Sequence, residues 1–404
     1  MMEALMQRAE VKPRMAKLGA YTAKAKALDP RKFPEEEFEL FSVPSHAEGK
    51  PEVVVGKTVG ASKQMVEDDT VLLCKINPRI NRTWVVSSHT GHRKIASSEW
   101  MTFPPSSDFL PKYLGYYLQQ DELRDHLALS ASGVGGSLMR AKPGLVKDYP
   151  FPLFPLPEQR RIVSAIETQL GRLDAAVSRL HAAKAKLKRY KQAVLKAAFS
   201  EGEPTRLEEL CEFITKGTTP TKTMFSEKGT VPFIKVYNLT RDGSLDFTVD
   251  PTFVEQSVHE KFLARSIVYP GDLLMNIVGP PLGKVSLVPD DYPEWNINQA
   301  IVRYRAKEKL RTKYLMYYLL CDSTAQELMA TTKATAGQFN LTLAHCRDLQ
   351  IPLIPIDEQD FLIEHLEQRL GVIDETETTL DAQLLQSTRL RQAVLKRAFE
   401  GRLV

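Results

Sequence analysis

The chain has few cysteines, and their spacing suggests no structural role for them. Its 404 residues include four, Cys74, Cys211, Cys321 and Cys346, with no C-x-x-C pair among them. The sequence therefore predicts neither a disulfide framework nor a zinc site, and a reducing cytoplasm is the expected compartment. No run approaches the roughly 18 apolar residues that a membrane-spanning helix needs. We expect no membrane association.

Motifs for chemistry are also missing. The sequence contains no G-x-x-x-x-G-K-[ST] loop for nucleotide phosphates, and its eight histidines show no paired ligand spacing. An adenine methyltransferase needs an Asn/Asp-Pro-Pro-aromatic loop to hold a flipped base. The nearest match is Gly279-Pro280-Pro281-Leu282, which lacks both the polar acceptor and the aromatic ring. These absences indicate a binding protein and not an enzyme.

The overall composition is that of an ordinary globular protein. Hydrophobic residues make up 43% and charged residues 26%, and the formal net charge is +4. A chain of this length is expected to hold two or three domains, each with its own core. The mild positive charge permits a nucleic-acid partner without requiring one.

The main feature that is present is a long internal repeat. Residues 151–199 recur 200 positions later as residues 351–399, with 19 of 48 positions identical from Pro152 to Phe199. Two copies about 150 residues apart do not make a solenoid. The repeat instead divides the chain into two halves, each a globular segment followed by a long helix.

Each repeated segment has the heptad pattern of a coiled coil. Between Glu158 and Phe199, and again between Glu358 and Phe399, there is no proline and only one glycine. Apolar residues recur every seven positions in both copies. A helix of about 42 residues would be roughly 63 Å long. We expect the seam of a helix pair at Ile166, Leu173, Leu180, Leu187, Val194, Leu366, Ile373, Leu380 and Val394.

The two helices carry opposite charge. The first contains 10 Lys/Arg and 3 Asp/Glu between Glu158 and Phe199, whereas the second contains 5 and 8 between Glu358 and Phe399. Opposite charge favours pairing of the helices with each other, and we expect them to be antiparallel. Alternatively, each helix packs only on its own domain and turns its charges to solvent.

The globular segments repeat more faintly. Residues 112–118 match residues 313–319 at six of seven places, as amphipathic KYLxYYL stretches whose Tyr-Leu stripe suits core packing. Short β-branched and aromatic runs predict strands between them, at Val53–Val55, Val71–Ile76, Thr83–Val86, Pro232–Tyr237, Ser266–Tyr269 and Val285–Val288. The fold class is therefore α+β, with an internal pseudo-two-fold repeat. A duplicated scaffold with divergent loops suggests two sites of one kind with different specificities.

At this point the chain resembles the specificity subunit of type I restriction–modification systems. The resemblance rests on a Pro-Leu-x-Pro-x-x-Glu-Gln helix entry and a Gln-Ala-Val-Leu-Lys-x-Ala-Phe exit, each present twice. Lys216-Gly217-Thr218-Thr219-Pro220 is similar to the family's Gly-Gly-Thr-Pro loop, with Thr218 in place of the second glycine. The first half lacks this loop, and its assignment depends on position and on the KYLxYYL repeat.

The resemblance implies an organisation and a set of partners. It implies recognition domains at 34–150 and 204–350 and helical spacers at 151–203 and 351–404, and it leaves the role of the basic N-terminal extension at 1–33 unassigned. Such a subunit binds a bipartite, asymmetric site in double-stranded DNA together with two methyltransferase subunits, and with two restriction subunits in the full complex. S-adenosylmethionine, ATP and Mg²⁺ would belong to those partners, and this chain would bind no cofactor or metal.

Candidate DNA contacts follow from side-chain chemistry. Lys and Arg neutralise phosphates, whereas Arg, Asn, Gln and Lys can read base edges. In the first half we select Lys57, Lys63, Lys75, Asn77, Arg79, Asn81, Arg82, Arg93 and Lys94. In the second half we select Lys216, Thr218, Thr219, Lys222, Lys235, Tyr237, Asn238 and Arg241. Any one of them could equally be a solvated surface residue.

Two other functions remain as alternatives. One is a coiled-coil scaffold with two protein-binding heads and no role on DNA. The other is a divergent methyltransferase–nuclease fusion, which the missing catalytic loops disfavour. Whether the chain, alone or with a methyltransferase, shifts a specific duplex separates these alternatives from DNA recognition.

Overall fold

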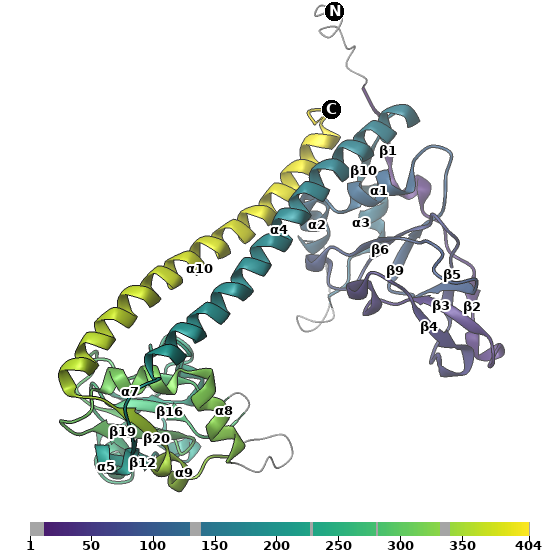
Figure 1. Cartoon of the computed structure of the whole chain (residues 1–404). Coiled ribbons are helices and arrows are strands. Elements are labelled where there is room, and N and C mark those ends of the chain that lie inside the picture. The colour runs from purple at the N-terminus through teal and green to yellow at the C-terminus, as the bar shows by residue number, and fades with distance from the viewer. Residues whose placement is uncertain (1–11, 130–138, 227–228, 280–281, 332–339, 404) are drawn as a thin grey trace, which may run out of the picture. The chain divides into compact units, whose positions relative to one another are not determined.

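The chain divides into two compact units, each containing parts of both long helices (Figure 1). The computed structural model describes residues 12–129, 139–226, 229–279, 282–331 and 340–403. Unit 1 consists of Met1–Leu180 with Ala382–Val404, and unit 2 of His181–Asp381. We call residues 12–155 head 1 and residues 199–355 head 2.

The repeated segments are continuous helices, as the heptads predicted. Helix α4 spans Leu156–Ala198 and α10 spans Ile356–Phe399. In unit 2, Lys184 contacts Asp381 at 2.6 Å, and Lys191, seven residues on, contacts Asp374, seven residues back, at 2.7 Å. In unit 1, Asp174 contacts Arg391. The helices are therefore antiparallel in each unit, which confirms that prediction.

Head 1 is built from short strands and three short helices. Its strands form sheets in the orders β2-β5-β8-β3-β4, β7-β6-β9 and β1-β10. The strands are β1 (Arg14–Lys17), β2 (Ala27–Leu28), β3 (Glu37–Phe41), β4 (Glu52–Val55), β5 (Lys63–Met65), β6 (Val71–Cys74), β7 (Thr83–Val85), β8 (Arg93–Ala96), β9 (Trp100–Phe103) and β10 (Pro150–Leu153). The helices are α1 (Pro111–Leu118), α2 (Asp121–Leu129) and α3 (Pro143–Asp148).

Head 2 repeats this plan. Its sheets have the orders β14-β13-β18-β15, β12-β19-β16-β17 and β11-β20. The strands are β11 (Glu203–Arg206), β12 (Cys211–Lys216), β13 (Val231–Ile234), β14 (Phe253–Val254), β15 (Ile267–Val268), β16 (Leu273–Asn276), β17 (Val285–Leu287), β18 (Trp295–Ile297), β19 (Ile301–Ala306) and β20 (Gln350–Leu353). The helices are α5 (Leu207–Leu210), α6 (Gln256–Glu260), α7 (Thr312–Leu319), α8 (Asp322–Ala330) and α9 (Leu343–Asp348).

The two heads share strand pairings, although their sequences are only faintly similar. Strand β3 is parallel to β8, and β13 is likewise parallel to β18. Strand β1 pairs with β10 as β11 pairs with β20, so residues 14–17 of the basic N-terminal stretch belong to the sheet structure of unit 1. The predicted strand at Pro232–Tyr237 was too long, because β13 ends at Ile234 and a 3₁₀ turn follows at Val236–Asn238.

The seam positions differ in burial along the helices. Ile166, Leu366, Ile373 and Val194 are buried, and they belong to the apolar cores that join each head to its helices. Leu173, Leu187 and Val394 are half-buried against the same cores. Leu180 and Leu380 are half-exposed, and neither belongs to an apolar cluster of the described residues. The helix pair is thus held most firmly where the heads pack against it.

The entry glutamine of each helix fastens the head that precedes it. Gln159 accepts a hydrogen bond from the Leu110 N–H at 2.8 Å and donates to the Asp108 and Phe154 carbonyls, both at 2.8 Å. Gln359 does the same with the Arg311 N–H and with the carbonyls of Lys309 and Ile354, at 2.8–3.0 Å. Both side chains are fully buried. Each therefore joins the start of a long helix to the start of α1 or α7.

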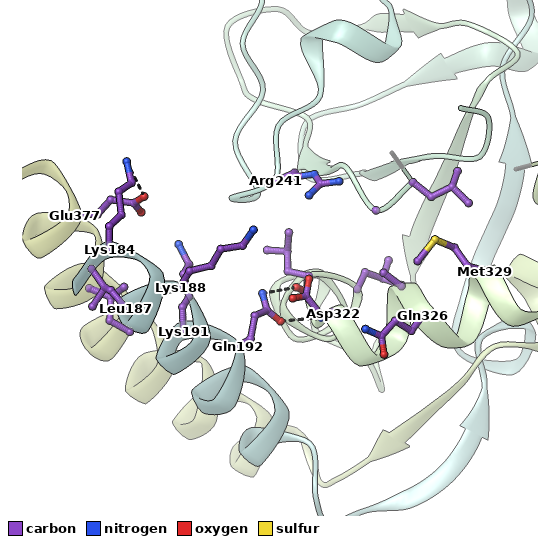
Figure 2. Close-up of a pocket in the computed structure, with 16 residues that line it drawn as sticks. Lys184, Leu187, Lys188, Lys191, Gln192, Arg241, Asp322, Gln326, Met329 and Glu377 are labelled. Carbon is purple, nitrogen blue, oxygen red and sulfur yellow. Dashed lines mark hydrogen bonds and ion pairs between the residues drawn. The ribbon is translucent and has the colours of Figure 1, made fainter. Parts of the chain in front are cut away.

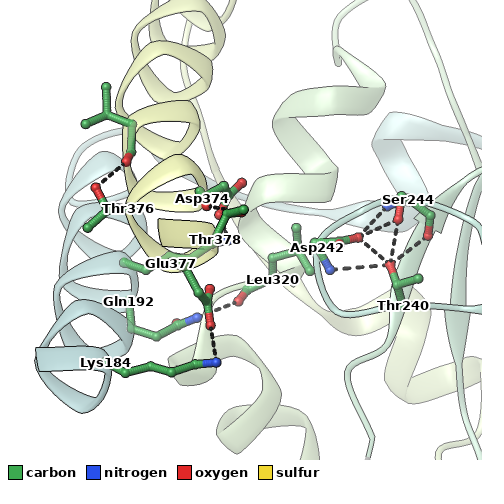
Figure 3. Close-up of polar contacts among 12 residues, drawn as sticks. Lys184, Gln192, Thr240, Asp242, Ser244, Leu320, Asp374, Thr376, Glu377 and Thr378 are labelled. Carbon is green, nitrogen blue, oxygen red and sulfur yellow. Dashed lines mark hydrogen bonds and ion pairs between the residues drawn. The ribbon is translucent and has the colours of Figure 1, made fainter. Parts of the chain in front are cut away.

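The exit glutamine of each helix fastens the head of the other half. Gln192 accepts from the Asp322 N–H at 2.7 Å and donates to the Leu320 carbonyl at 3.3 Å (Figures 2 and 3). Gln392 accepts from the Asp121 N–H at 3.0 Å and donates to the Gln119 carbonyl at 3.2 Å. Each bonds the backbone where α7 gives way to α8, or α1 to α2.

The KYLxYYL stretches complete the same joint. Tyr113 and Tyr117 donate to the Pro152 and Pro150 carbonyls at 2.6 Å, and Phe399 packs edge-on against both rings. In unit 2, Tyr314 and Tyr318 donate to Pro352 and Gln350, and Phe199 takes the place of Phe399. The prediction that this stripe packs in the core is confirmed. The repeated glutamine, tyrosine and phenylalanine positions thus build one head–helix joint, made twice.

Gln359→Leu is expected to destabilise unit 2 by about 2–4 kcal/mol, because leucine leaves buried backbone groups without partners. Gln368→Leu is the matched control on the same helix, since Gln368 is exposed and its amide only reaches Glu364 at 3.5 Å. Urea unfolding followed by circular dichroism measures both variants. Equal stability of the two would contradict the proposed role of the buried glutamine.

Candidate nucleic-acid interface

The loop after β6 carries the candidates Lys75, Asn77, Arg79, Asn81 and Arg82, and some of these side chains bond other parts of head 1. Asn81 donates from its amide to the Leu118 carbonyl at 2.8 Å, and Lys75 donates to the Ser98 carbonyl at 2.7 Å. Arg82 is half-buried, and Asn77 adopts a left-handed backbone that begins the 3₁₀ turn Pro78–Ile80. Arg79 is exposed. Within this loop, Arg79 is the side chain best placed to meet a ligand.

Most other basic candidates of head 1 are already paired. Arg93 forms a bidentate ion pair with Glu36, and its guanidinium lies 4.4 Å from the Phe33 ring centroid. The hydrogen bonds from Arg93 hold the pKa of Glu36 below its usual value. Lys94 forms an ion pair with Asp68 at 3.3 Å, and Lys57 forms one with Glu35 at 3.1 Å. Lys63 is half-buried on β5 and has no ion pair among the described residues.

In head 2, the loop after β12 is hydrogen-bonded to three residues that were not among the candidates chosen from the sequence. The Thr218 hydroxyl accepts hydrogen bonds from Arg265 at 2.9 Å and from the Ser266 hydroxyl at 2.8 Å. The Thr219 hydroxyl accepts from the backbone N–H of Gln299 at 3.3 Å. Arg265 and Gln299 are exposed, as are the candidates Lys216 and Lys222. An exposed patch of donors and cations therefore surrounds this loop.

Gly217 allows the loop to lie against β18. A Cβ atom at this position would stand 2.1 Å from the Ile297 carbonyl oxygen and 2.4 Å from that of Asn298, and both are rigid backbone atoms. We expect Gly217→Ala to displace the loop and destabilise unit 2 by about 1–3 kcal/mol.

Gly371→Ala provides the control for Gly217→Ala, because Gly371 lies within α10 with open space around it. Alanine there should be neutral or stabilise by up to about 1 kcal/mol. Thermal melting of the two variants distinguishes them, and a Gly217→Ala protein as stable as the parent would refute the close-contact argument.

The candidates that follow β13 have mixed positions. Asn238 is buried, and its amide donates to the carbonyls of Asp246 at 3.1 Å and Val249 at 2.8 Å, so it holds the loop together. The Tyr237 hydroxyl donates to Asp250 at 2.6 Å, and the Lys235 ammonium lies 5.5 Å from the Tyr237 ring centroid. Arg241 is exposed and faces a cavity beside α4.

The side chains that could bind a metal ion or act as a nucleophile were surveyed among the described residues. No group of three or more His, Cys, Asp or Glu side chains within them could hold a metal ion. The four cysteines are buried, and burial raises the pKa of the Cys211 and Cys321 thiols to about 12. Pro280 and Pro281 of the poor methyltransferase-loop match lie outside the described residues. Among the helices described, none is long and apolar enough to cross a membrane.

Comparison with known proteins finds a family model that matches part of the chain, and relatives to which the chain is similar. Residues 200–386 match the family model of the type I restriction modification DNA specificity domain. The chain is 24% identical over 306 residues to the type I restriction enzyme EcoBI specificity subunit of Escherichia coli, covering 68% of this chain and 63% of that protein. It is also 24% identical over 291 residues to the EcoKI specificity subunit of E. coli strain K12, covering 68% and 62%. The matches thus span less than two thirds of these relatives.

Solved structures share the fold. A chain from a structure of type I R-M system assembly and conformational transition superposes with a TM-score of 0.78 at 21% identity, over 98% of this chain and 100% of that one. The HsdS subunit from Thermoanaerobacter tengcongensis gives 0.53 at 21% identity, over the full length of both. The chain thus resembles the specificity subunits of type I restriction–modification systems in sequence, and it shares their fold.

Proposed function

We propose that this chain is the sequence-specific DNA-recognition subunit of a type I restriction–modification complex. It would bind a bipartite, asymmetric duplex site and position methyltransferase and restriction subunits on it. The observation that supports this most is the contrast between joints and loops. The two head–helix joints use the same residue types and the same backbone partners, whereas the exposed loops differ. A scaffold duplicated in this way holds loops of different sequence at the same place on each head.

Each head would read one half-site. The proposed readers are exposed side chains without an acidic partner among the described residues: Arg79 in head 1, and Lys216, Lys222, Arg265 and Gln299 in head 2. Arg and Lys can donate to guanine, and Gln can bond adenine through two atoms. Asn81 and Asn238 would instead support the loops that carry the readers. Two methyltransferase and two restriction subunits would supply S-adenosylmethionine, ATP and Mg²⁺.

A binding assay separates this function from its rivals. The purified chain, with its methyltransferase partner, is mixed with a library of random duplexes, and bound DNA is selected and sequenced. DNA recognition predicts enrichment of two short motifs separated by a fixed, unspecified spacer. A protein-binding scaffold predicts no enrichment at all. A methyltransferase–nuclease fusion predicts that the chain alone, given S-adenosylmethionine or Mg²⁺, modifies or cuts the duplex.

The helix pair should set the spacer between half-sites. Inserting four residues after Ala182 and four after Ala382 adds about 6 Å to both helices. The insertion points lie between the Asp174–Arg391 pair of unit 1 and the Lys184–Asp381 pair of unit 2 along both helices, so the paired insertion leaves each ion pair inside its own unit. We expect a spacer changed by one or two base pairs, at 3.4 Å per pair, with both motifs intact.

An insertion in α4 alone is the control for the paired insertion. It shifts the register of one helix against the other, so it should weaken or abolish assembly and not simply retune the spacer. Selection from the random-duplex library reads out both variants. A paired insertion that leaves the spacer unchanged at full activity would contradict the role of the helices as the ruler.

A further inference from the structure

A basic cavity of about 790 Å³ lies in unit 2 between α4, the start of α8 and the loop that follows Asn238 (Figure 2). Its lining includes four cations, Lys184, Lys188, Lys191 and Arg241, and two carboxylates, Asp322 and Glu377. Leucine side chains from α4 and α7 contribute an apolar part of the wall. The cavity therefore carries an excess of two positive charges, four minus two.

Pairing with α10 accounts for only part of the charge of α4. Residues 175–199 contain seven Lys/Arg and no Asp/Glu. Within the described residues, α10 neutralises Lys184, which contacts Asp381 and Glu377, and Lys191, which contacts Asp374. Lys188 is exposed and has no ion pair or side-chain hydrogen bond in the part of the chain described. Lys188 is therefore the lysine of the cavity wall that does not pair with α10 in the described structure.

Arg241 faces Lys188 across the cavity from a stiff loop (Figure 2). The Asp242 carboxylate accepts hydrogen bonds from the Ser244 N–H at 2.9 Å, the Ser244 hydroxyl at 2.7 Å and the Thr240 hydroxyl at 2.5 Å (Figure 3). Burial acts to raise the pKa of Asp242, but these hydrogen bonds outweigh it and keep the pKa below its usual value. The carboxylate is used to shape the loop, and it forms no ion pair with Arg241.

The described residues of unit 1 show no equivalent arrangement. The positions of α10 that correspond to Lys184 and Lys188 in the repeat are Leu384 and Thr388, and Arg391 at the third position contacts Asp174. Where Ala325 lines the cavity in α8, α2 carries Arg124, which pairs with Asp121 and Asp125. A ligand bound in the same way by both units would need the same cations in each, and unit 1 lacks the counterparts of Lys184 and Lys188. The cavity in unit 2 therefore fits one occupant per chain.

We propose that this cavity receives a phosphate of the DNA backbone, with Lys188 and Arg241 as its counter-ions. The inference rests on the proposed function, which brings DNA to head 2. Two cations that face each other suit the two non-bridging oxygens of one phosphodiester, and a guanidinium can hold such a group through two N–H donors. Contacts of this kind add affinity and carry no sequence information. Arg241 is thus a phosphate contact and not a base reader.

The test uses the full chain in complex with its methyltransferase partner. The variants are Lys188→Gln and Arg241→Gln, singly and together. Lys186→Gln is the control, because Lys186 lies on the same basic stretch but about 200° around the helix from Lys184, at 100° per residue, and does not line the cavity. Fluorescence anisotropy gives the affinity for duplexes with and without the recognition motif at several salt concentrations.

We expect the double variant to reduce the slope of log affinity against log salt by about 0.9 and each single variant by part of that, with binding weakened on the order of fivefold at 0.15 M salt in the double variant. The loss should be equal on both duplexes, with the selected motif unchanged, and Lys186→Gln should behave as the parent. Lys188→Arg and Arg241→Lys should retain binding, which shows that a loss in the Gln variants is due to charge and not to misfolding.

Three results would overturn the inference while leaving the proposed function standing. Cavity variants that bind like the parent would do so, as would a loss confined to the motif-bearing duplex, which would indicate base reading. Normal DNA binding with a lost protein partner would assign the cavity to an acidic protein segment instead. Absence of any DNA binding by the parent complex would instead be a failure of the proposed function itself.

Discussion

Replacing head 1 should change one half of the DNA motif completely and leave the other half intact. The exchange takes residues 34–150 from a relative and keeps both long helices. It is expected to work because head 1 meets the helices through Gln159, Gln392 and Phe399, which the exchange keeps, and through Tyr113, which a relative with the KYLxYYL stretch supplies itself. Selection from a random-duplex library, or sequencing of modified bases in a host, identifies the motif of the hybrid.

The reciprocal exchange of residues 204–350 is the matched control for the head 1 exchange. It should change the other half-site only, and the spacer should stay the same in both hybrids because the helices are untouched. If either exchange altered both half-sites together, the two heads could not be independent readers. An unaltered motif would place the specificity outside the exchanged segment.

Ile373→Asp should be the most damaging single substitution in the helix pair. Ile373 is 3% exposed and lies in the apolar core of unit 2 with Leu366 and Leu370. Aspartate there would place a carboxylate among the buried apolar side chains of this core, which we expect to cost about 3–5 kcal/mol. Unfolding in urea measures the loss, and a limited digest should show unit 2 becoming sensitive to protease.

Two further substitutions calibrate the Ile373→Asp result. Val372→Asp introduces the same charge one residue away, where the side chain is 65% exposed, and should change stability by no more than about 0.5 kcal/mol. Leu173→Asp, at the matching position of α4, should fall between the two because Leu173 is half-buried. Comparable losses at Val372 and Ile373 would mean that the helix face was assigned wrongly.

Periodic and local features of this chain could be predicted from its sequence. Heptads gave both long helices nearly to the residue, because helix formation depends on side chains three and four positions apart. Opposite net charge pointed to the antiparallel pair, which Lys184–Asp381 and Lys191–Asp374 realise.

Contacts between distant residues could not be predicted. Gln192 bonds the backbone at Leu320, 128 positions away, and no spacing rule connects them. The same holds for Thr218 and Arg265, which share a hydrogen bond across 47 positions. Asn81 and Asn238 were chosen as base readers for their amide chemistry, yet both amides bond the backbone of their own head. Residue type alone does not reveal whether a polar group faces solvent or satisfies a buried carbonyl.

The measurement that tests the account most directly is sequencing of modified bases in the genome of a host that carries this chain and its methyltransferase partner. The account predicts one bipartite, asymmetric motif, modified on both strands when both genes are present and unmodified when either is deleted. A motif that persists without this chain, or no motif with both genes expressed, would contradict its role as the subunit that chooses the DNA sequence.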